Sequence, residues 1–293
     1  MRIKVWPFRY TVKLMLFLIF YTSLVNSIQN FYTFPRLAIP LPVWVTLNSP
    51  LTSPVGAFDL LQLMLAHGQA PLLILSILLI IGCVFGKIFC GWACPLGFMQ
   101  ELIIKLRSSM PHVSRSIDIA AKKVKYLLLF IILTVSTTLA ISLKQEWGQS
   151  YRNALGVFSY GPTITISPDT TLTGTLPRLL TQGWLAITQI NALTVLKIFV
   201  LIVFLVGSYS VPLFWCRYIC PLGALMGIFA RYSLLGLKRS PTKCERCPYC
   251  VRKCPTQVRI LELPWEKFND MDCILCFDCV DACPHGAISP KIP

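Results

Sequence analysis

Histidine and acidic residues are scarce in this chain of 293 residues, which has 3 histidines and 12 acidic residues against 27 lysines and arginines. The histidines, His67, His112 and His285, all lie outside the long apolar stretches of the sequence. A membrane haem of the b type needs histidine ligands inside its helical bundle, so the sequence argues against such a cytochrome. Neither a G-x-G-x-x-G fingerprint nor a P-loop occurs, which argues against these nucleotide sites.

Charged residues are also few, at 13% of the chain, whereas 55% of the residues are hydrophobic. About a quarter of the residues of a soluble globular domain are charged. The net charge of +15 is compatible with nucleic-acid binding. However, lysine and arginine also collect in the cytoplasmic loops of membrane proteins. The long uncharged stretches favour the membrane protein, and we expect no nucleic-acid partner.

Four apolar stretches are long enough to cross a bilayer, for which a helix needs about 20 residues. They cover residues 11–28, 70–89, 126–143 and 192–215. Basic residues precede the first stretch, as in a signal peptide, but no small-residue cleavage site stands out, so a retained helix is expected. The sequence therefore predicts an all-α membrane bundle of four transmembrane helices.

Basic residues are distributed unevenly between the two sides of these stretches. Residues 1–13, 87–125 and 215–293 hold four, seven and eleven of them, whereas residues 29–69 and 144–190 hold one and three. Lysine and arginine mark cytoplasmic segments. The distribution predicts a multi-pass protein of the inner (cytoplasmic) membrane with both termini in the cytoplasm.

The sequence contains an internal repeat, in which FCGWACPLG at residues 89–97 matches WCRYICPLG at residues 215–223. Each copy follows an apolar stretch, the second and the fourth, and precedes a further apolar segment. The repeat predicts two related helical hairpins with paired motifs at one membrane face. We assign residues 1–235 to this membrane domain.

The repeat places two cysteines four residues apart in each half, Cys90 with Cys94 and Cys216 with Cys220. Residues at i and i+4 lie on one face of a helix, and a following proline turns or opens it. The four thiols are expected to converge as a redox-active dithiol pair, as a soft-metal site for Cu(I), or as ligands of another metal centre. The alternative is four cysteines buried in a helical turn.

Two more residues lie near the first motif. Cys83 precedes Cys90 by seven residues, and a lone cysteine in an apolar span is usually a small core residue. Glu101 is the nearest carboxylate to either motif. We expect Glu101 on a solvated helix face, with the alternative that it accepts a proton from a redox substrate.

The last fifty residues contain two cysteine runs, each with the spacing C-x₂-C-x₂-C-x₃-C-P of bacterial ferredoxins. In this pattern the fourth cysteine of each run binds the cluster of the other run. We therefore assign two [4Fe–4S] clusters to an α+β ferredoxin domain at residues 236–293. The predicted ligands are Cys244, Cys247, Cys250 and Cys283 for cluster 1, and Cys273, Cys276, Cys279 and Cys254 for cluster 2.

This spacing argues against structural zinc, which usually takes C-x₂-C pairs separated by a longer loop. His285 directly follows the last run, and we expect it to be a solvated loop residue. Two neighbouring clusters store and pass single electrons, so electron transfer is the predicted function.

Together, the four apolar stretches, the two C-x₃-C-P motifs and the terminal ferredoxin motifs resemble the NapH/MauN family of ferredoxin-type membrane proteins. NosR and the CcoG-type cupric reductases share this core. The resemblance implies a quinol dehydrogenase component that passes electrons from membrane quinol, through partner redox subunits, to a periplasmic redox system. Two alternatives are a copper-binding, cupric-reducing assembly factor, which would use Cys90, Cys94, Cys216 and Cys220, and a redox-sensing regulator.

Overall fold

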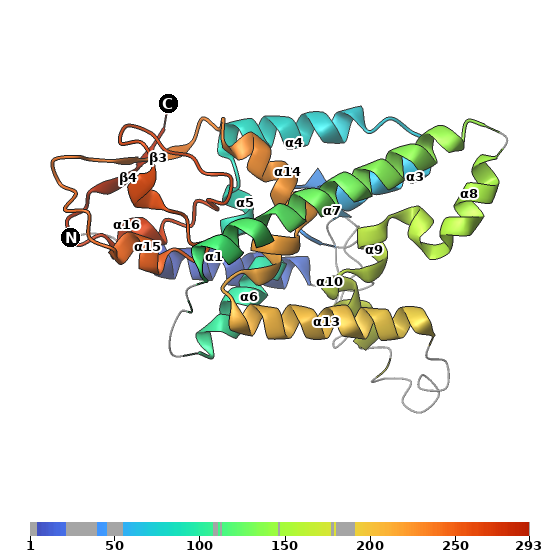
Figure 1. The fold of residues 1–293 in the computed structure, drawn as a ribbon, viewed down its shortest axis with the longest axis horizontal. Coiled ribbons are helices and arrows are strands. Elements are labelled where there is room, and N and C mark those ends of the chain that lie inside the picture. Colours follow the sequence, from blue (N-terminus) through green and yellow to red (C-terminus); the bar gives the residue numbers. More distant parts are fainter. Residues whose placement is uncertain are drawn as a thin grey trace.

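The structure is a computed structural model that describes residues 5–21, 40–45, 55–107, 111, 113–145, 147–176, 179 and 191–292. It is an elongated bundle of helices with a small, cysteine-rich tail at one end (Figure 1). Both ends of the chain lie at the tail, so the first helix runs back beside the last residues of the sequence (Figure 1).

Four helices form the frame of the bundle: α1 (Val5–Phe20), α4 (Leu72–Phe85), α7 (Arg115–Ser142) and α13 (Ala192–Ser210). Only α7 and α13, among the described residues, are long and apolar enough to cross a membrane, judged by length and composition. Of the four predicted spans, two therefore correspond to helices of the required length and composition.

The other two helices are shorter than predicted. Helix α4 has 14 residues, because it begins after Pro71 and stops at Gly86, whose φ of 62° ends the helical path. At 1.5 Å per residue it is about 21 Å long, less than the hydrocarbon thickness of a bilayer. Helix α1 has 16 residues and starts at Val5 rather than at residue 11. Residues 22–28 of the first predicted span lie outside the described residues.

Shorter elements connect and cover these four helices. In the first half of the chain they are β1 (Pro40–Leu41), β2 (Val55–Gly56), α3 (Ala57–Ala66), α5 (Ile88–Trp92) and α6 (Pro95–Lys105). Between α7 and α13 lie α8 (Gly148–Leu155), η1 (Gly156–Tyr160), α9 (Pro162–Ile166), α10 (Pro168–Thr170) and η2 (Thr171–Thr175). The second half continues with η3 (Trp215–Ile219) and α14 (Pro221–Ala230).

The two halves of the repeat interlock rather than stand side by side. Helix α14 packs on α4, and α6 packs on α13, so the helix after the motif in each half lies against the apolar helix before the motif in the other. Buried side chains from both halves, including Leu78, Leu96, Phe204 and Leu222, share one apolar core. This exchange brings both C-x₃-C-P motifs together where the bundle meets the tail.

The tail contains β3 (Gly236–Arg239), α15 (Tyr249–Lys253), η4 (Ile260–Glu262), α16 (Asp278–Ala282) and β4 (Ile288–Lys291). Strands β3 and β4 pair antiparallel from Gly236–Lys291 to Arg239–Ile288, which closes an α+β unit at the C-terminus. A separate apolar core, which includes Leu237, Val258 and Phe268, fills it.

Two glycines allow the bundle and the tail to approach closely. A Cβ at Gly91 would lie 2.3 Å from the carbonyl oxygen of Ile274, and one at Gly227 would lie 2.7 Å from that of Met271. Any side chain at either position would therefore push the tail away. The two halves of the repeat each contribute one of these glycines, so the tail docks on both.

Candidate metal centres

Three cavities of the structure are each lined by four cysteines. The four-thiol pocket, between the repeat motifs, is lined by Cys90, Cys94, Cys216 and Cys220. The first-run pocket is lined by Cys244, Cys247, Cys250 and Cys283. The second-run pocket is lined by Cys254, Cys273, Cys276 and Cys279. In both tail pockets the fourth cysteine comes from the other run, which is the grouping assigned to clusters 1 and 2.

The spacing of the thiols fits a cluster better than a single ion. No three His, Cys, Asp or Glu side chains of the described residues come close enough to hold one metal ion. Four thiolates on one zinc ion lie about 2.3 Å from it. A [4Fe–4S] cluster instead spreads its thiolates over four irons around a larger body. Each of the three cavities is therefore lined by four cysteines that are not gathered around a single ion in the described residues.

Left-handed residues shape both tail pockets in the same way. Arg246 and Leu275, the second residue after the first cysteine of each run, have φ of 54° and 49°. Gln257 and Gly286, the third residue after each fourth cysteine, have φ of 51° and 59°. These turns wrap each run around its pocket.

Backbone N–H groups point at the two exchanged cysteines. Val258 donates to Sγ of Cys254 at 3.4 Å, and Ala287 donates to Sγ of Cys283 at 3.2 Å. Burial raises the pKa of Cys273 to about 12 and raises the pKa of Cys250. Without a metal these thiols remain protonated at neutral pH, so loading a cluster must release protons.

The motif cysteines do not share one helical face, so this part of the prediction is wrong. Cys90 lies in α5, whereas Cys94 is the residue before Pro95, which begins α6. In the second half, Cys216 lies in the π-helical turn η3 and Cys220 precedes Pro221 at the start of α14. Each proline starts a new helix, and the turn before it directs both cysteines into the cavity.

Polar groups of the bundle reach the sulfurs of Cys94, Cys216 and Cys220. The N–H of Gly223 donates to Sγ of Cys220 at 3.2 Å. Gln100, in the other half, donates Nε2 to Sγ of Cys216 at 3.2 Å. Burial raises the pKa of Cys90 to about 11 and that of Cys216 well above its ordinary value. Anionic sulfur in this pocket therefore depends on a bound cation or cluster.

Positive charge also surrounds the four-thiol pocket. Lys87 and Arg217 line it and are 3% and 1% exposed. Lys87 donates Nζ to the carbonyl oxygen of Met271 at 2.9 Å and makes no ion pair among the described residues. Its charge is therefore available to offset anionic ligands.

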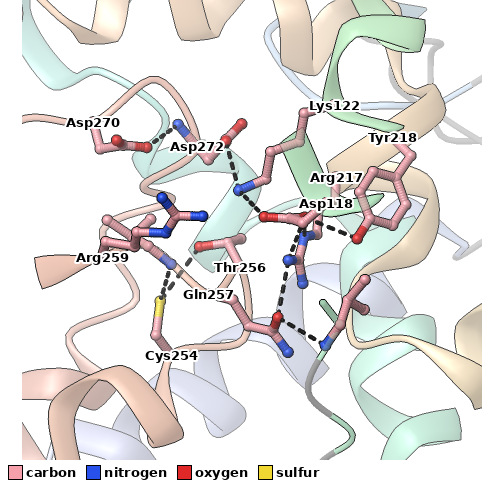
Figure 2. A network of polar contacts seen from close by, with 12 residues as sticks. Asp118, Lys122, Arg217, Tyr218, Cys254, Thr256, Gln257, Arg259, Asp270 and Asp272 are labelled. Atoms are coloured by element: carbon pink, nitrogen blue, oxygen red, sulfur yellow. Dashed lines mark hydrogen bonds and ion pairs between the residues drawn. The ribbon is translucent and has the colours of Figure 1, made fainter. Parts of the chain in front are cut away.

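A charged network joins α7, η3 and the tail (Figure 2). Arg217 pairs with Asp118, which also accepts a hydrogen bond from Tyr218 at 2.9 Å. Lys122 bridges Asp118 at 2.9 Å and Asp272 at 3.0 Å. Because Asp272 immediately precedes Cys273, this network fixes the second cysteine run against the bundle.

Asp272 carries its negative charge in spite of its burial. Burial alone raises the pKa of this carboxyl, but the ammonium groups of Lys125, Lys87 and Lys122 outweigh it and hold the pKa well below its usual range. Lys125 also pairs with Asp272 directly and is fully buried.

The four-thiol pocket and the second-run pocket share a wall. Thr256 and Ile274 line both cavities. The hydroxyl of Thr256 lies 3.5 Å from Sγ of Cys254 (Figure 2). The second-run pocket is therefore the neighbour of the four-thiol pocket, while the first-run pocket shares no lining residue with it.

Helix α1 is tied to the second-run pocket by a buried charge cluster that sequence reasoning missed. Arg9 contacts Glu101 at 3.3 Å, Asp278 at 3.1 Å and the carbonyl oxygen of Cys276 at 3.2 Å. Lys13 pairs with Glu101 at 2.7 Å. Glu101 is 5% exposed, so the expectation of a solvated face is wrong. In the sequence, the basic residues near the N-terminus predict only the orientation in the membrane. No sequence pattern indicates that Arg9 and Lys13 are buried.

Two single residues lie beside the pockets. His285 contacts Glu245 at 3.2 Å, and both line the first-run pocket at its exposed edge. Cys83 lies in α4 and lines none of the three pockets.

Comparison with known proteins agrees with this arrangement. A family model described as a 4Fe-4S binding domain matches residues 68–112 and 192–242, which contain the two C-x₃-C-P motifs. A second model, described as a 4Fe-4S dicluster domain, matches residues 243–288.

Three curated proteins illustrate the similarity. The uncharacterized protein MJ0749 of Methanocaldococcus jannaschii is 33% identical over 73% of this chain and 68% of its own length. The ferredoxin-type protein NapH of Escherichia coli is 28% identical over 82% of this chain and 74% of its own. The regulatory protein NosR of Pseudomonas aeruginosa is 26% identical over 67% of this chain and 24% of its own. No solved structure matches the chain.

Proposed function

Because this chain belongs to the NapH-like family of ferredoxin-type proteins, we propose that it is a membrane subunit that carries electrons from a quinol to a partner redox protein. The chain is an iron–sulfur electron-transfer protein of this type. The quinol and the direction of transfer belong to the proposal. The partner is a periplasmic or membrane-anchored redox subunit.

We assign the ligands by pocket. Cys244, Cys247, Cys250 and Cys283 hold one [4Fe–4S] cluster, and Cys273, Cys276, Cys279 and Cys254 hold the other. When bound, each cluster supplies a site that gains and loses one electron without making or breaking substrate bonds. The chain's own residues bury the ligands, direct N–H groups to them and keep Asp272 paired beside them.

One observation supports the transfer role above the others, namely the wall that Thr256 and Ile274 form between the four-thiol pocket and the second-run pocket. Centres separated by single side chains can exchange electrons directly. We infer a row of three sites, in which the four-thiol pocket comes first, the second-run pocket second and the first-run pocket third. The four-thiol pocket would then hold a third cluster.

The placement of the chain in the membrane is part of the same proposal. Residues 1–235 form the membrane domain and residues 236–293 the ferredoxin domain. Helices α7 and α13 span the bilayer, with α1 and α4 packed in the same bundle. The distribution of basic residues puts the tail and both termini in the cytoplasm of a cell with an inner membrane.

The test is anaerobic reduction of the purified full-length protein by a water-soluble quinol analogue, followed by EPR spectroscopy and an iron count. We expect reduced-cluster signals and about twelve irons per chain, four for each of three clusters. Reduction by dithionite but not by the quinol would overturn the quinol role. A count of about eight would overturn the third cluster alone.

A second candidate, copper handling, has support in the four soft thiols of Cys90, Cys94, Cys216 and Cys220. It predicts stoichiometric Cu(I) binding that Cys216→Ala abolishes while the iron content stays unchanged. The transfer role predicts the reverse, a loss of about four irons in the same variant. The wide spacing of the thiols favours the cluster.

A further inference from the structure

A cavity of about 690 Å³ lies between the bundle and the tail, and it shares Asp272 with the four-thiol pocket and Phe268 with the second-run pocket. From the bundle it is lined by Tyr126 of α7 and by Arg231 and Tyr232 at the end of α14. From the tail, Lys267 and Asp270 close the other side. Its volume is in the range of small-molecule sites, which is about 300–1,000 Å³.

This cavity lies at the level where α7 changes character. Lys122, Lys123 and Lys125 precede Tyr126, and the seven residues that follow it, about two turns, are apolar. Tyrosine is typical of the membrane–water boundary, where its ring is in lipid and its hydroxyl is hydrated. On the proposed membrane placement, the cavity at Tyr126 lies at the membrane–water boundary.

An apolar path leads from the cavity along the helix. Phe130 lies four residues after Tyr126, on the same face of α7, and is 68% exposed. A ligand with a polar head and a long apolar tail could place its head in the cavity and its tail beside Phe130. A water-soluble ligand without an apolar tail would not contact this apolar face of α7.

The cavity also adjoins the second cysteine run. The N–H of Cys273 donates to the carbonyl oxygen of Asp270 at 3.0 Å. A second, small cavity lies next to the large one. Both are lined by Ser233, Asn269 and Asp270, and Cys273 lines the small one as well. An occupant of the large cavity is therefore separated from a predicted cluster ligand by one turn of chain.

We propose that this cavity binds the head group of a membrane quinol. The cavity would then be the place where electrons enter the protein, and this inference rests on the proposed function. Tyr126 and Arg231 provide hydrogen bonds for the two quinol oxygens, and the ring of Tyr232 covers the head group. Among the described residues, the hydroxyl of Tyr126 makes one long contact of 3.7 Å, to the sulfur of Met271, and can turn to a ligand. Arg231 makes no ion pair among the described residues and is exposed at the mouth.

The step balances with groups already named. Oxidation of one quinol to the quinone releases two protons and two electrons. Both protons leave to water at the mouth, where Arg231 and Tyr232 are exposed. The electrons pass singly to the second-run site, which is the middle of the inferred row, and from there to a neighbouring site, so two one-electron acceptors match one quinol.

The experiment is photolabelling of the loaded full-length protein with an azido-quinone that carries a ten-carbon tail, mapped by mass spectrometry. We expect label on peptides that contain residues 126, 231–232 or 267–272, and competition by a short-tailed quinone. Tyr232→Ala should weaken binding of the quinone about tenfold, which corresponds to the loss of one well-packed aromatic contact. Tyr249→Ala is the matched control, because Tyr249 is 57% exposed on α15 and lines none of these cavities.

Label confined to other segments, or unchanged binding in Tyr232→Ala with its iron content intact, would overturn the site. Competition by vesicles of anionic lipid but not by quinone would also overturn it, because the cavity would then be a lipid site. If quinol reduces the clusters of the wild type while label falls elsewhere, the proposed function stands and only this site is wrong. If quinol neither labels nor reduces, both are wrong.

Discussion

Gln100 connects the two halves of the repeat at Cys216. Its Nε2 donates to the sulfur of Cys216 at 3.2 Å, and its Oε1 accepts the N–H of Trp215 at 2.8 Å. The side chain is fully buried. A donor on a ligand sulfur stabilises the reduced, more negative state of a cluster and raises its potential.

Gln100→Leu should therefore lower the reduction potential of the four-thiol centre by on the order of tens of millivolts. Redox titration followed by EPR measures this change. Gln62→Leu is the matched control, because Gln62 is equally buried but bonds to Thr163 far from any cysteine. An equal shift in both variants would show that the change is general and would contradict a role for the hydrogen bond.

Two charged residues near the second-run pocket should shift the reduction potential of its cluster in opposite directions. Arg9 lies against the carbonyl oxygen of Cys276, and Glu101 lies on the far side of Arg9. Arg9→Gln removes a positive charge and should lower the potential of the second-run cluster, whereas Glu101→Gln removes a negative charge and should raise it. Potentials measured by EPR-monitored titration should move apart by on the order of tens of millivolts. Shifts of the same sign would point to loosened packing instead.

Asp272→Asn should loosen the tail from the bundle. The change leaves Lys122 and Lys125 with a neutral partner in a buried site, and breaking a buried pair in this way costs about 3–5 kcal/mol. Loss of cluster absorbance in a denaturant series should therefore occur at a lower midpoint. Glu262→Gln is the control, since Glu262 is an exposed partner of Arg115 and Arg259 and should change stability by less than about 1 kcal/mol.

The direction of the pKa shift of Asp272 determines how the ion pairs of this residue depend on pH. The pKa of Asp272 is lowered in the folded chain, so its stabilisation is complete above the ordinary carboxyl range near about pH 4 and is lost only as the pH falls through the lowered pKa. The wild type should show no change from this residue between about pH 5 and 8. On the acid side, the midpoint difference between wild type and Asp272→Asn should shrink only in strong acid, and a difference that shrank between about pH 5 and 7 would contradict the assignment.

The cysteine spacing predicted the grouping of the tail pockets, because ligand spacing is a local property of the chain. The repeat likewise predicted two related halves, and the family resemblance is confirmed by the comparisons. The helical face of Cys90 and Cys94 was predicted wrongly, because Pro95 begins a helix here rather than bending one. Glu101 was misplaced for another reason: its partners Arg9 and Lys13 lie about ninety residues away, and periodicity carries no information on such pairs.

The assignment of each run's fourth cysteine to the cluster of the other run can be tested directly. Cys254 lies in the first run but lines the second-run pocket, and Cys283 does the reverse. Cys254→Ser should therefore alter the EPR signal of the cluster held by Cys273, Cys276 and Cys279 and leave the other unchanged, while Cys283→Ser should do the opposite. Each cluster is identified beforehand by the signal that Cys276→Ser or Cys247→Ser removes. If Cys254→Ser instead perturbed the same signal as Cys247→Ser, each run would hold its own cluster. Cys254, beside Thr256, would then bind the first-run cluster. The inferred order of the three sites would therefore be wrong.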